Sequence, residues 1–591
     1  MNYNKSQQQA IRHKDGPMLV LAGPGSGKTA VITQRTKQLI EYENIDPSNI
    51  LVITFTRAAA QEMKQRFLAL TGEERTKVTF GTFHAIFFMV LKLAYHFDSG
   101  NIISEEQRYQ FMREILSYHH LEYRDEGEFI GDVLTEISRV KNEQIPLEHF
   151  YSSSCGEEIF RKIYREYDER LKRNRLIDFD DMLTYTYDLF SQRKDILSAW
   201  QKKYRYILID EFQDINLIQW KIMCMLAAPE NNLFVVGDDD QSIYRFRGSK
   251  PEIMLGFQKI YPQAKIVNLE VNYRCEPPIV EAAMRLIAHN EERFPKKIRA
   301  GKAGKQKVRF QYFEDCYKEN AFLAEDIRQT VQNGVPLSEI AVLFRTNMQP
   351  RALMEYMVSA NLAFQTKDRI PDIYEHWIAR DFFTYIRIAQ GSDSLPDETV
   401  CFDEWMKLYE EQPWIAERIE KLWYDLKHLS RLSPYAAINY IRRGIGYDDY
   451  LAEYAEYRNA NKEDFYEVAD EILASAKGYR TFEEWFAHIE EYRQELKRLA
   501  QEKRRNQNAV TFATLHSAKG LEFTKVYLID VNEGVMPYKK AVLKQDVEEE
   551  RRLFYVGMTR AKESLTICSV KKMRGKEVEL SRFIKEAGKE P

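Results

Sequence analysis

Short apolar runs alternate with polar or glycine-containing loops along much of this chain. Their length and composition are typical of strands that are buried on both faces of a parallel sheet. One group lies early: Met18–Ala22, Ile50–Phe55, Tyr206–Ile209, Leu233–Val236 and Ile266–Leu269. A second group follows: Val308–Phe313, Ile340–Phe344, Val510–Thr514, Val526–Ile529 and Leu565–Val570. Because parallel strands need crossover helices, the pattern predicts an α/β fold with two parallel sheets.

Two long segments interrupt this rhythm. Both are rich in Glu, Arg, Tyr and Leu at helical spacing and contain no clear strand pattern. They cover residues from about 90 to 200 and from about 376 to 506. The end of the second segment, Phe482–Arg505, has the pattern of a charged amphipathic helix. We expect each segment to be a helical insertion into one of the α/β units.

Composition narrows the class of protein. A chain of 591 residues exceeds one compact core and predicts about two to four domains. Hydrophobic residues make up 44% and aromatic residues 13%, which excludes a disordered chain. No apolar run has the length of a membrane span, Met1–Gln9 lacks the apolar core of a secretory signal, and the six cysteines form no CxxC pair. We therefore expect a cytoplasmic protein with no membrane partner. The net charge of −4 argues against binding nucleic acid by bulk charge but allows a narrow basic groove.

A glycine-rich octapeptide follows the first apolar run and precedes a helical pattern: Ala22-Gly23-Pro24-Gly25-Ser26-Gly27-Lys28-Thr29. It fits the P-loop, with alanine in place of the first glycine. The glycines let backbone N–H groups curl around phosphate oxygens. Lys28 would place a cation on the β and γ phosphates, and Thr29 would offer a hydroxyl to Mg²⁺. An accidental glycine turn is the alternative, which the strand before and the helix after disfavour.

Two adjacent acids end the apolar run Tyr206–Ile209. The end of a parallel strand is where such a sheet presents ligand groups. Asp210 would hold the Mg²⁺ shell, and Glu211 would orient and polarise the attacking water. An Asp-Glu pair after a strand is often a solvated turn. Its place after a P-loop instead predicts a Walker B site, so ATP and Mg²⁺ are the expected ligands.

Further segments stand in a fixed order around these two motifs: Tyr3–Ala10, Thr54–Met63, Gly81–His84, Asp178–Asp181, Val236–Gly248, Leu269–Cys275, Thr514–Phe523 and Glu549–Lys562. In combination they resemble the motifs of UvrD/Rep/PcrA-type DNA helicases of superfamily 1A. The resemblance extends from Asn4 to about Lys562 and leaves out only the two helical segments. It implies two RecA-like lobes with one ATP site between them. The Asp178–Asp181 signature has no chemical role that the sequence suggests.

The resemblance implies roles around the nucleotide. Gln7 would recognise the adenine edge through its amide, which can donate and accept, and Tyr273 would stack on the adenine. Glu522 would contact the ribose, and Gln241 would sense the γ-phosphate. Arg274 would reach the same phosphate, and Arg560 would be the arginine finger, although a lone arginine on a helix usually forms a surface salt bridge. The implied catalytic set is thus Lys28, Glu211, Gln241, Arg274 and Arg560.

A second set of residues would contact DNA. Tyr244 and Phe246 would stack on bases, since such stacking tolerates any sequence. They could also be core aromatics, but the neighbouring Arg245 and Arg247 favour a wet groove. The implied DNA-binding residues are Phe55, Thr82, His84, Tyr244, Phe246, Arg247, Thr514 and His516. The chain departs from the family at Arg57-Ala58, where Asn-Lys is usual, and at Phe246, where Trp is usual.

The motifs and the helical segments together predict four parts. Residues 1–90 plus 201–277 would form the ATP-binding lobe 1A, with 91–200 as its helical insertion 1B. Residues 278–376 plus 507–591 would form lobe 2A, with 377–506 as its insertion 2B.

The implied activity is that of an ATP-dependent DNA helicase and single-strand translocase with 3′-to-5′ polarity, in repair or replication. Its partners would be single-stranded DNA and junctions of single strand with duplex, bound by a monomer or a DNA-dependent dimer. Two alternatives stay open. The motor could strip proteins from single strands with little unwinding, or ATP could only regulate a DNA-binding scaffold.

Overall fold

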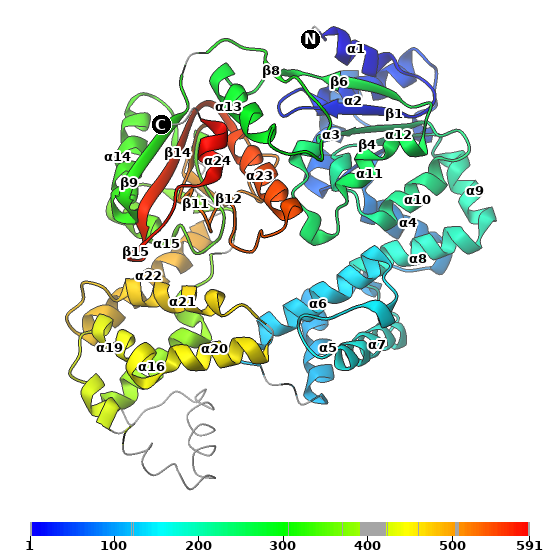
Figure 1. The fold of residues 1–591 in the computed structure, drawn as a ribbon. Helices are drawn as coiled ribbons and strands as arrows, with labels where there is room; N and C mark the ends of the chain where they lie inside the picture. The colour runs from blue at the N-terminus through cyan, green and yellow to red at the C-terminus, as the bar shows by residue number, and fades with distance from the viewer. Residues whose placement is uncertain are drawn as a thin grey trace.

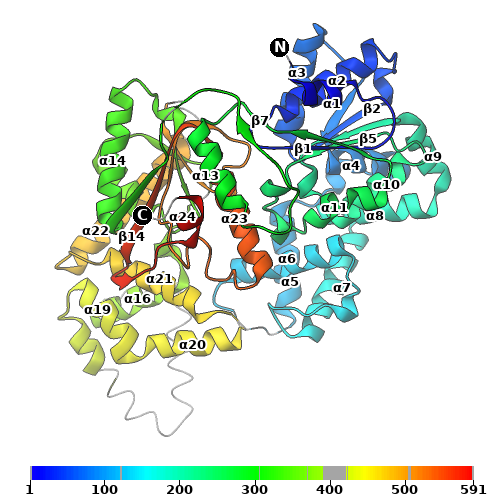
Figure 2. The same ribbon diagram turned by 45° about the horizontal axis from the view of Figure 1, so that its top comes forward.

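The computed structural model describes residues 3–588 except 120, 122, 305, 369, 391–420, 422–423, 459 and 503–507. Two α/β lobes lie side by side, and a helical unit lies below each of them (Figures 1 and 2). This arrangement confirms the predicted fold class of two parallel-sheet lobes with helical insertions. Among the described helices, none combines the length and the apolar character needed to cross a membrane.

The first sheet is parallel throughout and has the strand order β3-β2-β4-β5-β1-β6. Its strands are β1 (Met18–Ala22), β2 (Ile50–Thr54), β3 (Thr79–Thr82), β4 (Tyr206–Ile209), β5 (Leu233–Gly237) and β6 (Lys265–Leu269). Alternate side chains of each strand point to opposite faces, so the sheet separates two apolar cores.

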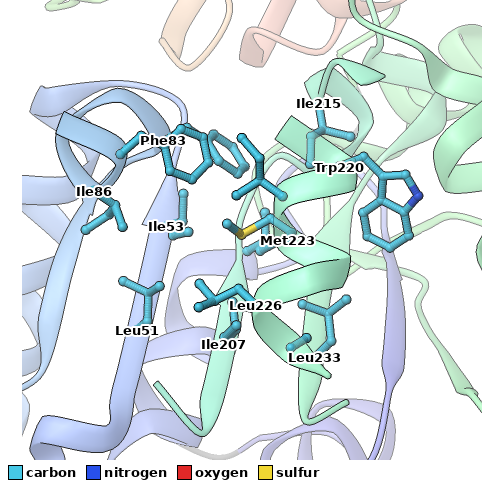
Figure 3. Packing of buried hydrophobic residues seen from close by; sticks show 14 of the residues in the cluster. Leu51, Ile53, Phe83, Ile86, Ile207, Ile215, Trp220, Met223, Leu226 and Leu233 are labelled. Atoms are coloured by element: carbon cyan, nitrogen blue, oxygen red, sulfur yellow. The ribbon is translucent and has the colours of Figure 1, made fainter. Parts of the chain in front are cut away.

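Helices cover both faces of this sheet. One core includes residues of α1 (Lys5–Arg12), α2 (Lys28–Glu41) and α3 (Arg57–Thr71). The other includes residues of α4 (Phe83–Tyr95), α8 (Phe179–Gln192), α9 (Lys194–Lys203), α10 (Leu217–Ala227), α11 (Pro251–Leu255) and α12 (Phe257–Ile260). Figure 3 shows part of the second core, where side chains of β2 and α4 face Met223 and Leu226 of α10.

The second sheet has the order β11-β12-β10-β13-β14-β15, and β9 also pairs with β14. Only the β14–β15 pair is antiparallel among its described pairings. Its strands are β9 (Arg309–Asp315), β10 (Ile340–Phe344), β11 (Phe364–Thr366), β12 (Val510–Thr514), β13 (Phe523–Leu528), β14 (Ala561–Met573) and β15 (Lys576–Glu577). One face packs on α13 (Pro277–Ile287), α23 (Lys544–Met558) and α24 (Arg582–Ala587), and the other on α14 (Cys316–Gln332) and α15 (Arg351–Ser359). A separate small ribbon pairs β7 (Val271–Asn272) with β8 (Arg299–Ala300).

Each helical unit has an apolar core of its own. The first core contains residues of α5 (Glu105–Ser117), α6 (Glu126–Glu143) and α7 (Glu157–Arg173). The second contains residues of α16 (Trp377–Ala389), α19 (Pro434–Tyr440), α20 (Tyr447–Tyr457), α21 (Lys462–Ser475) and α22 (Phe482–Glu502). The predicted helix Phe482–Arg505 is thus present as far as Glu502, and its last residues lie outside the described part of the chain.

Some strand limits differ from those that the apolar runs predict. The short strands β3 and β11 are too brief and too polar to stand out in the sequence. Phe55 lies just past the end of β2, and β14 extends from Ala561 to Met573, well beyond its apolar centre. The reason is that backbone pairing with a neighbouring strand continues across polar residues.

Candidate nucleotide site and nucleic-acid interface

The glycine-rich loop turns the chain from β1 into α2. Gly25 and Gly27 have φ angles of 64° and 84°, in the left-handed region that glycine adopts without strain. A Cβ atom at Gly25 would lie 2.6 Å from the Cβ of Arg274 and 2.7 Å from Asn272 Oδ1. The hydroxyl of the buried Ser26 has no hydrogen-bond partner among the described residues. An unpartnered hydroxyl in a tight glycine turn fits a loop that binds phosphate.

The two acids after β4 lie beside this loop. Lys28 Nζ donates to Glu211 Oε1 at 2.9 Å, and Gln213 donates to the other carboxylate oxygen of Glu211. Glu211 has a φ of 50°, a left-handed conformation that costs a non-glycine residue about 1–3 kcal/mol. Residues held in this way concentrate where chemistry takes place. The structure therefore holds the predicted P-loop lysine against the predicted catalytic acid.

The two carboxyl groups differ in electrostatic environment. Burial, with the neighbouring charge of Glu211, raises the pKa of Asp210 to about 7. Burial also favours the neutral form of Glu211, but Lys28 and Lys519 outweigh it and lower the pKa of Glu211 to about 2. Glu211 is therefore ionised, whereas Asp210 lacks enough positive charge nearby to hold its anion firmly. That imbalance fits a site that a divalent cation completes.

A cation at Asp210 would need ligands beyond the protein. Within the described residues, no group of three or more His, Cys, Asp and Glu side chains could hold a metal ion. Mg²⁺ commonly takes one or two protein ligands together with water and substrate phosphates. Thr29 lies in the first turn of α2, immediately after Lys28. The available donors therefore fit Mg²⁺ bound together with a nucleotide.

We call the boundary between the two lobes at the P-loop the nucleotide cleft. Arg560 of the second lobe reaches it, and Arg274, at the junction between the lobes, donates to the carbonyl of Thr559 at 3.3 Å. Arg560 is buried, and its guanidinium donates to Gln241 Oε1 at 3.2 Å and to the carbonyl of Val556 at 2.9 Å. Gln241 in turn donates to Asp238 Oδ2 at 2.6 Å. Burial, together with the nearby Arg274, lowers the pKa of Arg560 to about 9. Among the described residues Arg560 forms no salt bridge, so this buried cation faces the cleft without an anionic partner.

The remaining predicted nucleotide residues also border the cleft. Arg274 Nε donates to Glu522 Oε2 at 2.8 Å, so these two predicted ligands form an ion pair at the junction between the lobes. Tyr273 leaves 47% of its surface exposed, and its hydroxyl accepts a hydrogen bond from Asn4 at 3.0 Å. Gln7 Nε2 donates to the carbonyl of Ser26 at 3.0 Å. The amide of Gln7 is therefore fastened to the P-loop, and its oxygen accepts from the backbone N–H of Asn4, the residue that contacts Tyr273.

Lys519 is a site residue that lies outside the predicted set. Its Nζ donates to Asp214 Oδ2 at 2.5 Å and to the carbonyl of Gln241 at 2.7 Å, and lies 4.9 Å from the centre of the Tyr244 ring. Lys519 follows β12 in the second lobe, whereas its partners belong to the first. The motif Thr514–Phe523 marks the loop, but a single lysine in it does not reveal partners in another lobe.

Aromatic side chains from both lobes form a cluster beside this bridge. The rings of Phe55 and Tyr244 stack with centroids 5.6 Å apart and planes 5° from parallel. Phe246 is 60% exposed and meets His516 edge-on at 5.4 Å. The Arg247 guanidinium lies 5.3 Å from the rings of both Tyr244 and Phe246. The exposure of Phe246 and the cation beside it argue against a core role and favour a wet binding surface.

A groove of about 1120 Å³ continues from this cluster toward the first helical unit. It is lined by predicted DNA-binding residues of the first lobe: Phe55, His84, Tyr244, Phe246 and Arg247. Helices α5 and α6 add Arg108 and Arg139. The lining also includes the acidic residues Glu105, Glu143, Asp180, Asp214 and Glu252, so the groove is not uniformly basic. Its rings offer stacking surfaces for bases, and its guanidinium groups can contact phosphates.

Two predicted DNA-binding threonines do not line this groove. The Thr82 hydroxyl accepts from the backbone N–H of Ala85 at 3.3 Å and so caps α4. The Thr514 hydroxyl accepts from the backbone N–H of Ser517 at 3.2 Å, and Thr514 is buried. Both hydroxyls shape loops next to the cluster.

The Asp178–Asp181 signature acquires a structural explanation. Lys141 of α6 is buried and donates to Asp178 at 2.9 Å and to Asp181 at 2.7 Å. Asn142 donates to Asp180 at 2.7 Å. The signature therefore fastens the helical unit to α8, which belongs to the core of the first lobe, and so holds one wall of the groove.

Two α/β lobes built on largely parallel sheets meet at one P-loop, and the buried Arg560 of the second lobe contacts Gln241 of the first. This geometry defines a P-loop NTPase with two RecA-like lobes. Comparison with known proteins specifies the family. The UvrD/REP helicase N-terminal domain matches residues 3–262, and the UvrD-like helicase C-terminal domain matches residues 267–395 and 402–572.

Individual relatives agree with these matches. YjcD of Bacillus subtilis is 34% identical over 98% of this chain and 80% of its own length. The ATP-dependent DNA helicases PcrA of Staphylococcus epidermidis and of Bacillus subtilis are both 31% identical, over 99% and 96% of this chain and 86% and 82% of their own lengths. The chain belongs to the UvrD/REP family of ATP-dependent DNA helicases.

Proposed function

We propose that this enzyme hydrolyses ATP between its two lobes to move 3′ to 5′ along single-stranded DNA and to unwind duplex, in repair or replication. The observation that carries the proposal is the 3.2 Å contact between Arg560 of the second lobe and Gln241 of the first. Gln241 lies three residues from Tyr244 and five from Phe246 in one continuous loop. A change at the nucleotide therefore has a short covalent path to the surface that would contact bases.

The chemical roles follow from the charges in the cleft. Lys28 and the backbone of Gly23–Gly27 would bind the phosphates, and Thr29 and Asp210 would hold Mg²⁺, which supplies charge neutralisation at the phosphates. The ionised Glu211 would polarise the attacking water. Arg560, buried and without an anionic partner among the described residues, would stabilise the negative charge that develops on the transferring phosphoryl group. Arg274 would assist after exchanging Glu522 for phosphate.

Three residues would position the base and sugar of ATP. The exposed Tyr273 ring offers a stacking surface for adenine. Glu522 of the second lobe accepts a hydrogen bond from Arg274, the residue after Tyr273, and would contact the ribose. Gln7 reaches the P-loop through Ser26 and would present its amide to the adenine edge. All three border the cleft from which Lys28 and Arg560 act.

Hydrolysis would change the distance between the two lobes. Loss of the γ-phosphate removes the shared anion that holds Lys28, Arg274 and Arg560 together, so the cleft can reopen. DNA would be held by rings of the first lobe, Phe55, Tyr244 and Phe246, and by His516 of the second, with Thr82, His84, Arg247 and Thr514 nearby. Because the lobes carry separate contacts, opening and closing would move one contact set along the strand.

The division into four parts also belongs to the proposal. What supports it is that α5–α7, and the described helices α16 and α19–α22, each surround a core distinct from those of the sheets. Helices α8 and α9, in contrast, share the core of the first sheet. The insertion 1B would therefore behave as a unit from about residue 103 to 176, with the remainder of 91–200 moving with lobe 1A.

The direct test measures ATP hydrolysis with and without single-stranded DNA. We expect strong stimulation by DNA and its loss in Lys28→Ala, a variant that should still melt cooperatively although it loses the ion pair with Glu211. Unwinding of duplexes with 3′ or 5′ single-stranded tails, beside displacement of streptavidin from biotinylated single strands, then assigns polarity and task. Equal activity on both tails would contradict the polarity, and streptavidin release without strand separation would assign the motor to protein stripping. A protein that binds DNA but never hydrolyses ATP faster on it would be a scaffold.

A further inference from the structure

A short segment between α13 and β8 spans the two lobes. It leaves α13, whose residues pack in the core of the second sheet, and ends beside the P-loop (Figure 1). A Cβ atom at Gly23 would lie 2.5 Å from Ile298 Cδ1, which shows how closely its end packs on that loop. We call residues Asn290 to Lys296 of this segment the bracket.

One end of the bracket holds the acidic turn of the first lobe. Lys296 is buried, and its Nζ lies 2.5 Å from Asp238 Oδ1, 2.6 Å from Asp239 Oδ1 and 2.8 Å from Asp240 Oδ2. Arg293 donates to both oxygens of Asp240, at 2.8 and 2.7 Å. These contacts place two cations against three consecutive carboxylates.

The other end of the bracket holds α23 of the second lobe. Asn290 Nδ2 donates to the carbonyl of Glu548 at 2.9 Å, and its Oδ1 accepts from Arg551 at 2.6 Å. The backbone N–H of Glu291 donates to the Glu548 carboxylate at 3.0 Å, and Arg552 donates to the carbonyl of residue 292 at 3.0 Å. Arg560 follows this helix by two residues.

The contacts at both ends form a closed chain of interactions that includes Gln241 and Arg560. Asp238, held by Lys296, accepts the 2.6 Å hydrogen bond from Gln241, and Gln241 accepts from Arg560 at 3.2 Å. From Arg560 the chain leads back through α23 to the bracket. Burying ion pairs is a poor source of stability, because desolvation offsets their attraction. Buried charges arranged in a ring around Gln241 instead impose a defined geometry.

We propose that Arg293 and Lys296 are positioning residues for ATP hydrolysis, which hold Asp238 to Asp240 so that Gln241 meets Arg560 when the lobes close. Among the described residues, no hydrogen bond or ion pair joins the bracket to Lys28 or Glu211, so it would act through the acidic turn. This role rests on the proposed function of Gln241 and Arg560 at the γ-phosphate. Such indirect support matters because small displacements of positioned groups reduce rates strongly.

The test compares variants at the two ends of the bracket. Arg293→Gln removes the paired hydrogen bonds to Asp240, and Asn290→Asp keeps the shape at the other end while losing the donor to Glu548. We expect both to lower kcat of DNA-stimulated hydrolysis by about 10- to 100-fold. The KM for ATP should change less than about twofold, since P-loop binding is untouched. Arg293→Lys, which keeps the charge, should recover part of the rate.

Lys544→Gln is the matched control. Lys544 forms an exposed ion pair with Glu291 of the same segment, so this variant perturbs the bracket without touching its buried contacts. It should keep the wild-type kcat. If Arg293→Gln fails to melt cooperatively, Asn290→Asp is judged by the same criteria. Wild-type kcat in a folded Asn290→Asp or Arg293→Gln variant would overturn the proposal.

A double-variant cycle separates positioning from general stability. If the bracket acts through Gln241, Gln241→Ala combined with Arg293→Gln should be no slower than Gln241→Ala alone. Losses that multiply would show that the bracket acts elsewhere and would overturn the inference. The proposed function fails on a different result, namely a wild-type protein whose hydrolysis is independent of single-stranded DNA or survives Lys28→Ala.

Discussion

The nucleotide cleft and the aromatic cluster lie side by side but consist of different kinds of side chain, charged in the cleft and aromatic in the cluster. The cleft places buried charges together, with Lys28 paired to Glu211 and Arg560 left without an anion among the described residues. The cluster stacks neutral rings, of which Phe246 is mostly exposed. The same loop supplies Gln241 to the cleft and Phe246 to the cluster, so the contrast arises within six residues.

The difference reflects what each surface has to do. Charges fixed in a low-dielectric cleft interact strongly with charge that develops during hydrolysis and need no reorganisation at that moment. Under the proposed function, the cluster would instead have to hold every base equally and release it, and ring stacking tolerates any sequence. Substitutions in the cleft should therefore change rates by orders of magnitude, whereas substitutions in the cluster should change DNA affinity moderately. The following predictions test this contrast, beginning with the largest effect.

Arg560→Ala should reduce DNA-stimulated kcat by about 10³-fold or more, as removal of an arginine finger does. Nucleotide affinity should fall much less, because Lys28 and the P-loop backbone remain. Steady-state hydrolysis and binding of a fluorescent ATP analogue measure the two quantities. A loss under about tenfold would assign the transition-state role to Arg274 or Lys519. It would also contradict the expectation that substitutions in the cleft change rates by orders of magnitude.

Glu211→Gln should slow hydrolysis by about 10²- to 10⁴-fold, the range for a positioned acid–base group. The amide keeps the size of the side chain but cannot polarise water, so the variant should accumulate on DNA in its ATP-bound form. Single-turnover hydrolysis and nucleotide binding measured on the same preparation are the relevant assays. Failure to bind nucleotide would instead assign Glu211 to the structure of the loop, through its pairing with Lys28.

Phe246→Ala should weaken single-strand binding by about 1–3 kcal/mol, or roughly 5- to 150-fold in Kd. DNA-free hydrolysis should persist, because the ring faces the groove and not the cleft. Fluorescence anisotropy with labelled oligonucleotides gives the affinity. Tyr151→Ala, at a tyrosine that is 77% exposed and does not line the groove, is the control for loss of a surface ring. A lower melting temperature with unchanged DNA affinity would make Phe246 a packing residue.

The smallest effect concerns His516. Burial, together with Arg345 and Arg247, lowers the pKa of His516 to about 3. Its folded pKa lies below the unfolded value of about 6.5, so the unfolded chain binds the proton first and His516 costs stability as pH falls from 6.5 toward 3. The melting temperature of the wild type should therefore decline more steeply than that of His516→Asn between pH 7 and pH 5. Parallel curves would mean that His516 is charged in the folded cluster.

Local motifs explain how much the sequence alone could predict. The P-loop turn at Gly23–Gly27 and the acid pair after β4 could be predicted from the sequence, because the conformation of a glycine turn and the end of a strand depend on adjacent residues. Strands β3 and β11 were not predicted, because their pairing partners and not their own composition define them. Lys519 and Lys296 were missed for the same reason, since their partners lie about 300 and 60 residues away along the chain.

The sequence by itself determined the fold class, the phosphate loop, the acid pair and the membership of the two lobes in one family of ATP-dependent DNA helicases. Each of these depends on periodicity, turn chemistry or residue order, which short stretches of chain encode. Only the tertiary structure decided that Arg560 meets Gln241, that Lys519 bridges to Asp214, and that Lys141 buries the Asp178 signature against the groove wall. Those contacts join segments that approach only when both cores form, and their energies depend on burial that no local pattern reveals.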